Sequence, residues 1–552
     1  MKNEKNDTDA LSNSGTMHNE VAETEPPANP STVLPTKRLA VVFAAMLLSI
    51  LLVALDQTIL ATALPRIASD FNAFPLQGWV ATSFVLTEST FLLFFGQMLR
   101  LFPAKWILVS TVGIFEIGSI MCAASQNMGT LIAGRTISGV GAAGMFVALL
   151  QVLSQATRLE DRPKYMGMLG GVFGISQIIG PLIGGRWNFW ISLPIGGLSM
   201  AVVSVFLKAV PPLGSDPTKR KWSDLLLQVW AIDWIGALLV AGSVTSFVLA
   251  TQWGGNTKPW NDKDVIIAFV FFGVLGIVFL LWERHIGDRA MTPLKIFKSP
   301  SIYAIVAFGF FNRFTNLLYA YYLPIFYQVV RRHSAFKSGV DLLPLLLSGV
   351  VFVISGGVLV SRFGYYYPFL IISAVFLAIS SGLFYTVNLS TSGAMLAGFQ
   401  ILLGVSNGFG MQNSVTAIQV EFHGQPKLLA QAQSVASFGQ FLGGMVGLSV
   451  AEPVFATELT KFLTRYAPDA PTAAVRDSPT TLYDFIPPAQ IPGVLRAYVE
   501  SLRIVFILGV PIGVLSLLAT AFIKNIKIVK EVPGKEQEAD GKEKQESSDA
   551  VV

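Results

Sequence analysis

The sequence contains very little of what enzymes and metal-binding proteins use at their sites. Its single cysteine, Cys122, excludes a disulfide framework and a redox-active thiol pair. Four scattered histidines give no metal-site spacing, and no Gly-x-x-x-x-Gly-Lys-Ser/Thr loop is present to hold ATP phosphates. No nucleophile–base set lies in the apolar segments. We therefore expect neither an enzyme nor a protein that depends on a metal or a cofactor.

Charged residues are also scarce. They make up 13% of the 552 residues, about half the share of a soluble globular protein, whereas 52% are hydrophobic. Apolar runs of about 20 residues, the length that spans a bilayer, recur from Leu39 to Phe522. The basic residues behind the net charge of +5 lie in short connecting loops, as orientation signals do. The composition predicts an all-α polytopic membrane protein without a nucleic-acid partner.

The order of the apolar runs predicts about fourteen transmembrane helices between two polar tails. The tails, 1–37 and 524–552, lack periodicity and are expected to be disordered. An even number of spans puts both tails on one side, and the excess of Lys and Arg in the loops of that side predicts that it is cytoplasmic. The predicted spans lie near 39–63, 78–99, 106–125, 130–154, 165–185, 188–209, 230–251, 265–283, 302–327, 339–360, 366–387, 393–416, 432–452 and 502–523.

Two parts of the chain resemble each other. The run 404–411 is similar to the run 139–145, and in that alignment Gln400 takes the place of Arg135. Matching the spans at an offset of eight predicts two six-helix halves with two helices inserted between them, and such halves place a substrate site at their interface. The predicted parts are an N-terminal half at 38–209, a linker with two extra helices at 210–301, and a C-terminal half at 302–523 with an external loop at 453–501.

Ionisable side chains inside a membrane are costly, so each one suggests a function. Within the predicted spans they are Asp56, Glu88, Glu116, Arg135, Asp233 and Arg313. Asp56 and Arg135 lie at a similar depth, which predicts a charge pair. The pairing could be replaced by a proton when the cavity changes sides. Alternatively, the pair could be a static salt bridge between two helices.

Glu88 and Glu116 fall near the middle of their predicted spans. A low-dielectric environment favours the neutral acid, which would suit a proton carrier. The alternative is a protonated acid that is hydrogen-bonded to a neighbouring helix. Both alternatives stay open for Glu88, whereas the structural role is the preferred interpretation for Glu116.

Two polar helix faces could line a substrate cavity. In the ninth predicted span the polar residues are Asn312, Arg313, Asn316 and Tyr319. In the twelfth they are Gln400, Asn407 and Met411. Polar stripes with aromatic and thioether surface suit amphipathic organic molecules, although hydrogen bonds between helices would use the same residue types.

The fifth predicted span contains glycines and a proline that favour a kink and close helix contact. These residues are Gly180, Pro181, Gly184 and Gly185. A proline interrupts the backbone hydrogen bonds, and glycines let a neighbouring helix approach. We expect a hinge or seal between the halves, with simple packing as the alternative.

Several of these segments resemble one family. The run 55–65, Leu-Asp-Gln-Thr-Ile-Leu-Ala-Thr-Ala-Leu-Pro, resembles the first-helix signature of the fourteen-helix drug:proton antiporters of the major facilitator superfamily. The segment around Arg135 resembles that superfamily's fourth-helix motif, whose arginine is implicated in proton coupling. The run 180–185 resembles the fifth-helix motif of antiporters, and the tails and the segment before the last span look like those of fungal toxin and multidrug efflux pumps.

The loop after the second helix departs from the family pattern. Arg100 occupies the position of an acidic residue, Pro103 replaces a glycine, and Lys105 is kept. The copy in the second half is closer to the pattern, which suggests altered gating and not lost transport. The candidate gating residues are Gly96, Arg100, Lys105, Gly357, Arg362 and Gly364.

The resemblance implies a monomeric, proton-coupled exporter of small amphipathic organic molecules, such as a fungal metabolite, toxin or drug. The proton gradient would supply the energy in place of a cofactor. The expected location is the plasma membrane, with the vacuolar membrane as the alternative. A proton-linked importer, for instance of siderophores, and a non-transporting sensor are the alternative functions.

Overall fold

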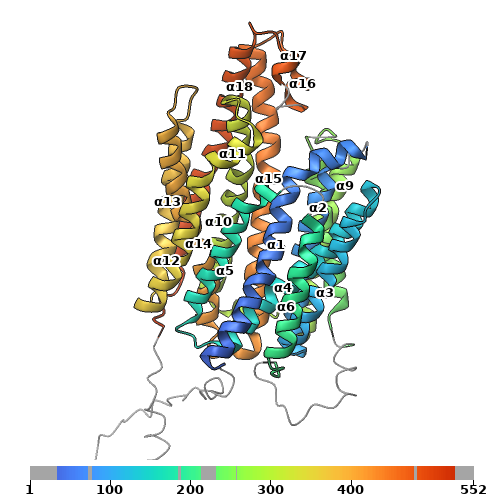
Figure 1. Ribbon diagram of the computed structural model, residues 1–552, viewed down its shortest axis with the longest axis vertical. Coiled ribbons are helices and arrows are strands. Elements are labelled where there is room, and N and C mark those ends of the chain that lie inside the picture. Colours follow the sequence, from blue (N-terminus) through green and yellow to red (C-terminus); the bar gives the residue numbers. More distant parts are fainter. Residues whose placement is uncertain are drawn as a thin grey trace, which may run out of the picture.

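The computed structural model of the protein is a long bundle of helices (Figure 1). It describes residues 34–71, 77–183, 188–212, 230, 232–255, 258–477 and 482–528. Within these ranges the only β-pairing is a single bridge between Gly254 and Lys258. The predicted all-helical membrane fold is therefore confirmed. Nearly all of both predicted tails lies outside the described residues.

Six helices form the N-terminal half. They are α1 Thr36–Asp70, α2 Gln77–Leu101, α3 Ala104–Ala123, α4 Met128–Ala156, α5 Arg162–Ile183 and α6 Asn188–Phe206. The Asn127 side chain accepts a hydrogen bond from the Thr130 N–H and starts α4. A buried apolar cluster from α1 to α6, centred on residues such as Phe84 and Phe115, is the core of this half.

The inserted hairpin and the C-terminal half follow. Their longer elements are α8 Trp234–Trp253, α9 Lys263–Ile286, α10 Pro300–Ile325, α12 Leu343–Phe363, α13 Tyr367–Tyr385, α14 Gly393–Glu421, α15 Pro426–Tyr466, α18 Ile491–Ile507 and α19 Gly509–Thr520. The short elements are η4 Gly287–Arg289, η5 Leu294–Lys298, η6 Phe326–Val330, α11 Ala335–Asp341, α16 Thr472–Asp477 and α17 Leu482–Phe485. Several of these helices have a proline in the first turn, where its missing N–H costs no hydrogen bond.

The helices match the expected membrane crossings. Among the described residues, 11 helical stretches are long and apolar enough to span a bilayer, with α18 and α19 counted as one stretch. Helices α5, α6 and α10 run in the same bundle beside them (Figure 1). The arrangement is consistent with the fourteen predicted spans.

The segment 453–501 differs from the external loop that was expected. Helix α15 has 41 residues and continues through Pro453 to Tyr466. At 1.5 Å per residue it is about 60 Å long, about twice the hydrocarbon thickness of a bilayer. Its last turns bury Leu459 and Leu463 and pack against α18, while polar side chains face outward. The end of the predicted apolar span near residue 452 is therefore not the end of the helix.

Both described ends of the chain lie at the same end of the bundle, which we call the tail side. The Leu34 N–H donates to the Ala156 carbonyl at 3.2 Å, and the Ile528 N–H donates to the Gly364 carbonyl at 2.9 Å. The opposite end, which we call the outer side, carries α16, α17 and the start of α18 (Figure 1). This placement agrees with an even number of crossings.

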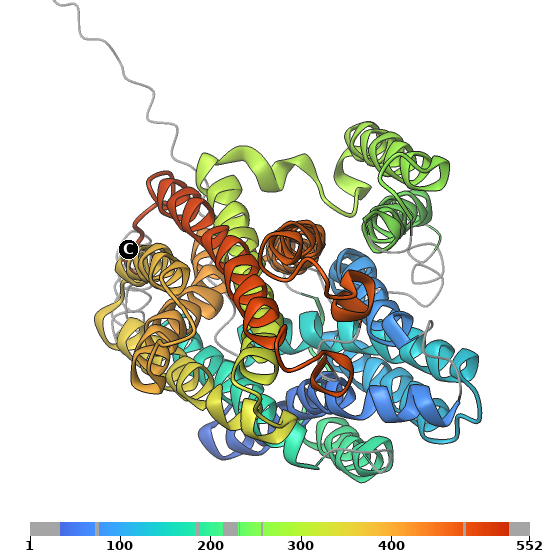
Figure 2. The ribbon, with the colours of Figure 1, turned by 90° about the horizontal axis from the view of Figure 1, so that it is seen from above.

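The two halves meet along two helix pairs. Helix α5 packs along α12, and α2 packs along α15. The α8–α9 hairpin lies at the edge of the bundle, as the view from above shows (Figure 2). Most of α9 is exposed and apolar, as expected for a helix that faces lipid. The halves, and not the hairpin, therefore enclose the centre of the molecule.

Candidate functional site

Arg135 is buried in α4 and forms an ion pair with Asp56 of α1. Its Nε also donates to the Val80 carbonyl at 3.3 Å, and its guanidinium lies 4.1 Å from the centre of the Phe84 ring. Only 2% of Arg135 and 4% of Asp56 is exposed, so the pair is screened from water. The structure thus brings together the two side chains that their similar depth predicted as partners.

Glycines on α4 hold the arginine in place by letting other helices approach. A Cβ on Gly139 would lie 2.5 Å from the Phe84 carbonyl oxygen of α2, and a Cβ on Gly141 would lie 2.5 Å from the Phe115 nitrogen of α3. Because α2 and α3 pack closely against two sides of α4, the Arg135 side chain has little freedom to leave its position.

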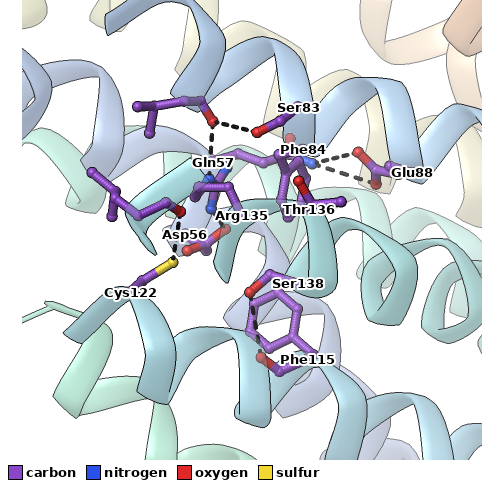
Figure 3. A network of polar contacts seen from close by, with 12 residues as sticks. Asp56, Gln57, Ser83, Phe84, Glu88, Phe115, Cys122, Arg135, Thr136 and Ser138 are labelled. Atoms are coloured by element: carbon purple, nitrogen blue, oxygen red, sulfur yellow. Dashed lines mark hydrogen bonds and ion pairs between the residues drawn. The ribbon is translucent and has the colours of Figure 1, made fainter. Parts of the chain in front are cut away.

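Gln57 connects this ion pair to a second acidic residue. Its Nε2 donates to the two carboxyl oxygens of Glu88 at 3.1 and 3.4 Å, and it directly follows Asp56 in α1 (Figure 3). Glu88 itself is buried on α2. Asp56 with Arg135 and Gln57 with Glu88 are thus two polar contacts made by consecutive residues of α1, and we call these four residues the coupling network. The sequence analysis did not single out Gln57, and the available signal was a polar side chain directly after Asp56 in an apolar run.

A small cavity lies between the halves beside the coupling network. Its volume is about 20 Å³, room for about one water molecule. Glu88 lines it from α2, and Arg313 lines it from α10. The remaining lining residues are Ile50, Val53, Met145, Phe146, Leu149, Phe173, Met411, Gln440 and Phe441. This central cavity has apolar, aromatic and thioether walls with a few polar groups, as organic-ligand sites do.

Only part of the predicted substrate face reaches this cavity. Arg313 and Met411 line it, whereas Asn316 accepts a hydrogen bond from Arg313 at 3.2 Å. Asn312 donates to the Ser373 hydroxyl, and Tyr319 donates to the Phe506 carbonyl. These last two side chains pack between helices of the C-terminal half, so the structure does not place them in the cavity.

Gln400 and Asn407 also lie outside the described cavity lining. Gln400 Nε2 donates to the Tyr327 hydroxyl at 2.6 Å and to the Asp341 carbonyl at 3.0 Å. Asn407 Oδ1 is buried and has no hydrogen-bond partner among the described residues. The cavity residues that the sequence did not predict come from α1, α4 and α5 in the first half and, with Gln440 and Phe441, from α15 in the second.

Gln400 occupies the position in the second half that Arg135 occupies in the first. Arg135 bonds to a side chain of α1 and a carbonyl of α2, whereas Gln400 bonds to a side chain after α10 and a carbonyl just before α12. The internal repeat predicted from the sequence is thus visible in the contacts. The side-chain contact is an ion pair in the first half, Arg135 with Asp56, and a neutral hydrogen bond in the second, Gln400 with Tyr327.

The other buried acids lie apart from the coupling network. Glu116 lies against Gly196 of α6, and its carboxyl oxygens have no hydrogen-bond partner among the described residues. Asp233 caps α8 through the Gly236 N–H and accepts a hydrogen bond from the Trp282 indole. The predicted hinge is described only in part: Gly180 and Pro181 lie in α5, and Gly184 and Gly185 lie outside the described residues.

Close contacts join the halves on the tail side. A Cβ on Gly96 of α2 would lie 2.6 Å from the Ser434 Cβ of α15, and a Cβ on Gly357 of α12 would lie 2.3 Å from the Pro163 carbonyl oxygen of α5. The Ser361 hydroxyl donates to the Glu160 carbonyl at 2.7 Å. The structure is therefore closed on the tail side.

The remaining gating residues have separate contacts. Lys105 donates to the Ser204 carbonyl at 2.7 Å, which ties the start of α3 to α6. Gly364 ends α12 in the left-handed conformation, with φ of 79°, where a glycine avoids a steric penalty. Arg362 is exposed in the turn before it.

Arg100 reaches a segment that follows the inserted hairpin. Its Nη1 donates to the Asp288 carbonyl at 2.6 Å, and Gln97 donates to the Arg289 carbonyl at 2.8 Å. From the other half, Gln431 of α15 donates to the carbonyls of Ala290 and Met291 at 3.0 and 3.2 Å. Residues 287–291, the linker turn, are thus bonded to both halves beside the contact between Gly96 and Ser434.

Comparisons with known proteins agree with this geometry. The family model described as "Major Facilitator Superfamily" matches residues 46–448. The chain is 37% identical over 492 residues to the "MFS-type efflux pump MFS1" of Arthroderma benhamiae, covering 88% of this chain and 90% of that protein. It is 33% identical over 512 residues to "Efflux pump aflT" of Aspergillus parasiticus, covering 90% and 97%.

A solved structure has the same fold. The proton:xylose symporter XylE aligns with a TM-score of 0.56 and 13% sequence identity, covering 90% of this chain and 98% of that chain. At this identity the likeness concerns the helix arrangement alone. It agrees with the arrangement of helices described above.

Proposed function

This chain belongs to the major facilitator superfamily, and on that basis we propose that it is a proton-coupled exporter of small amphipathic organic molecules. It is a multi-pass membrane transporter and not an enzyme. The proposed location is the plasma membrane with the tail side in the cytoplasm. The similarity to relatives named efflux pumps supports export over import.

One observation carries the proton-coupling part of the proposal: Asp56 of α1 is buried in an ion pair with Arg135, and the next residue, Gln57, binds an acid that lines the cavity. A proton on Asp56 would cancel its charge and leave Arg135 without its partner. An unpaired buried charge costs about 3–5 kcal/mol, so protonation favours a different arrangement of α1, α2 and α4. Proton binding would thereby be linked to opening or closing of the halves.

Efflux from cells tests this function. Cells with and without the protein would be loaded with a panel of fluorescent drugs and fungal toxins, and their accumulation measured before and after a protonophore. Lower accumulation that the protonophore reverses supports proton-driven export. Higher accumulation in cells with the protein would instead indicate an importer.

Neutralising the cavity acid with Glu88→Gln should uncouple efflux from the proton gradient. We expect uphill efflux to fall at least about tenfold, because the remaining amide has no proton to release, while downhill exchange of the same dye continues. Efflux from proteoliposomes with and without an imposed pH gradient measures both rates.

Glu116→Gln provides a matched control, since it makes the same change in a buried acid outside the coupling network. It should change uphill efflux by less than about twofold. Equal losses in the two variants would contradict a special role for Glu88.

The linker turn should stabilise the closed tail side. Gln431→Ala removes two hydrogen bonds to it. At about 1 kcal/mol each, their loss should increase the open fraction by up to about thirtyfold. Labelling of a cysteine placed at the buried Ser434, with Cys122 replaced by serine, measures this opening in membranes.

Gln433→Ala is the control, because this nearby buried glutamine makes no side-chain hydrogen bond to the described residues. Labelling that rises equally in both variants would show that the effect comes from α15 packing and not from the linker turn.

A further inference from the structure

Arg313 is the cation of the central cavity. It lies in the middle of α10 and lines the cavity from the C-terminal half, opposite Glu88 of the N-terminal half. Its guanidinium lies 5.7 Å from the centre of the Phe441 ring. A charged side chain at this depth is costly, and in membrane proteins such residues face pathways for ions or substrates.

The hydrogen-bonding capacity of Arg313 is largely unused. A guanidinium has five N–H donors, and within the described part of the chain only one hydrogen bond is formed, from Nη1 to Asn316 Oδ1 at 3.2 Å. No carboxylate of the described residues forms an ion pair with it. In contrast, Arg135 is paired with Asp56, and Arg503 at the outer side is paired with Glu500.

Glu88 on the facing wall is already engaged. Both of its carboxyl oxygens accept hydrogen bonds from Gln57, so the acid is held toward the coupling network. The unused hydrogen-bonding capacity of Arg313 is of the donor type. It complements an acceptor with negative charge and not a cation.

The walls around Arg313 suit the rest of an organic molecule. Phe146 and Phe441 come from opposite halves, with ring centres 6.0 Å apart, and Met145 and Met411 add flexible thioether surface. A guanidinium binds a carboxylate through two parallel hydrogen bonds, which fixes both position and orientation. Since the closed cavity has room for about one water molecule, the cargo would enter as the halves separate.

From this arrangement we propose that Arg313 is a binding site for the anionic group of the cargo, so that the preferred substrates are organic acids with an aromatic or apolar body. The inference rests on the proposed transport function and names its substrate class. The carboxylate or phenolate of the cargo would replace solvent at the guanidinium, while Phe146 and Phe441 contact its apolar part.

A matched set of probes tests the charge preference. 1-Pyrenebutyrate, 1-pyrenebutanol and 4-(1-pyrenyl)butyl-trimethylammonium share one aromatic body and differ in charge. Their affinities for the purified full-length protein in lipid nanodiscs can be measured by fluorescence anisotropy, and their efflux can be followed in cells. We expect the wild-type protein to bind the anion at least about tenfold more tightly than the alcohol, as expected when a charged hydrogen-bonded pair is gained.

Arg313→Gln should remove this preference and leave the affinity for the alcohol within about twofold, and Arg313→Lys should keep part of it. Arg503→Gln, which removes an arginine at the outer side, should retain the full preference. Monodispersity in size-exclusion chromatography checks that each variant is folded.

Binding of the three probes with equal affinity, or of none of them, would overturn the proposal, as would an anion preference that survives Arg313→Gln. The proposed function is tested separately by the efflux arm. An anion preference without protonophore-sensitive efflux would support the Arg313 site and contradict proton-coupled export. Protonophore-sensitive efflux without an anion preference would support proton-coupled export and contradict the Arg313 site.

Discussion

Replacing Arg135 with glutamine is expected to lower uphill efflux at least about tenfold while the protein still inserts into the membrane. The change leaves Asp56 buried without its partner. The cost of about 3–5 kcal/mol strongly favours the protonated acid, so Asp56 would no longer gain and lose a proton during the cycle. Cell-surface abundance and efflux, each with and without a protonophore, are the measurements.

A double variant, Asp56→Asn with Arg135→Gln, separates coupling from simple stability. It replaces the ion pair by two neutral amides, so thermal stability in detergent should recover relative to the single variant. The second half already carries a neutral arrangement at the corresponding place, Gln400 with Tyr327, which indicates that such a pair fits. If the ion pair couples transport to protons, uphill efflux stays lost in the double variant. Wild-type uphill efflux would instead identify a static salt bridge.

The parts of the fold that follow from hydropathy and repetition could be predicted from the sequence. Apolar length sets the number of crossings, and the similarity of runs 139–145 and 404–411 predicts the repeated halves. Contacts of Gly139 with α2 and of Gly404 with α12 realise that repeat in space. The pairing of Asp56 with Arg135 followed from their depth, because few partners are available to a charge in a membrane.

The cavity lining was harder to predict. Helical spacing identifies which residues share a face, but it does not tell which neighbouring helix covers that face. Tyr319 and Asn312 share a polar face that turns toward helices of their own half, where polar groups serve as hydrogen-bond partners. Arg313, one position along the helix, faces the other half.

The part of α15 that follows Pro453 shows a second limit of prediction from the sequence. Sequence hydropathy reports which segments are apolar enough to span a bilayer, and the segment 453–501 between two such spans was expected to be a loop. The helix continues because its apolar side, with Leu459 and Leu463, packs on α18 outside the membrane. Tertiary packing thus overrides the local signal of the proline.

Adding one methyl group at Gly357 should have an effect as large as the loss of Arg135. A Cβ there would lie 2.3 Å from the Pro163 carbonyl oxygen, and backbone atoms of α5 would have to move to relieve the contact. Gly357→Ala should therefore prevent the halves from closing on the tail side and lower efflux at least about tenfold. Labelling of a cysteine at Ser434 should rise in the same variant, because α2 and α15 separate together with α5 and α12.

Gly349→Ala is the matched control for this prediction. It makes the same change in the same helix, two turns earlier, and no atom lies within 4 Å of the added Cβ. Both substitutions raise helix propensity by about 1 kcal/mol, so a general effect on α12 would appear in both variants. Loss of efflux in Gly357→Ala alone, together with increased labelling at Ser434, would identify the close approach of α5 and α12 as the tail-side gate. Normal efflux with unchanged labelling would show that the two helices can separate at this point without opening the path, and the gate would then lie with α2 and α15.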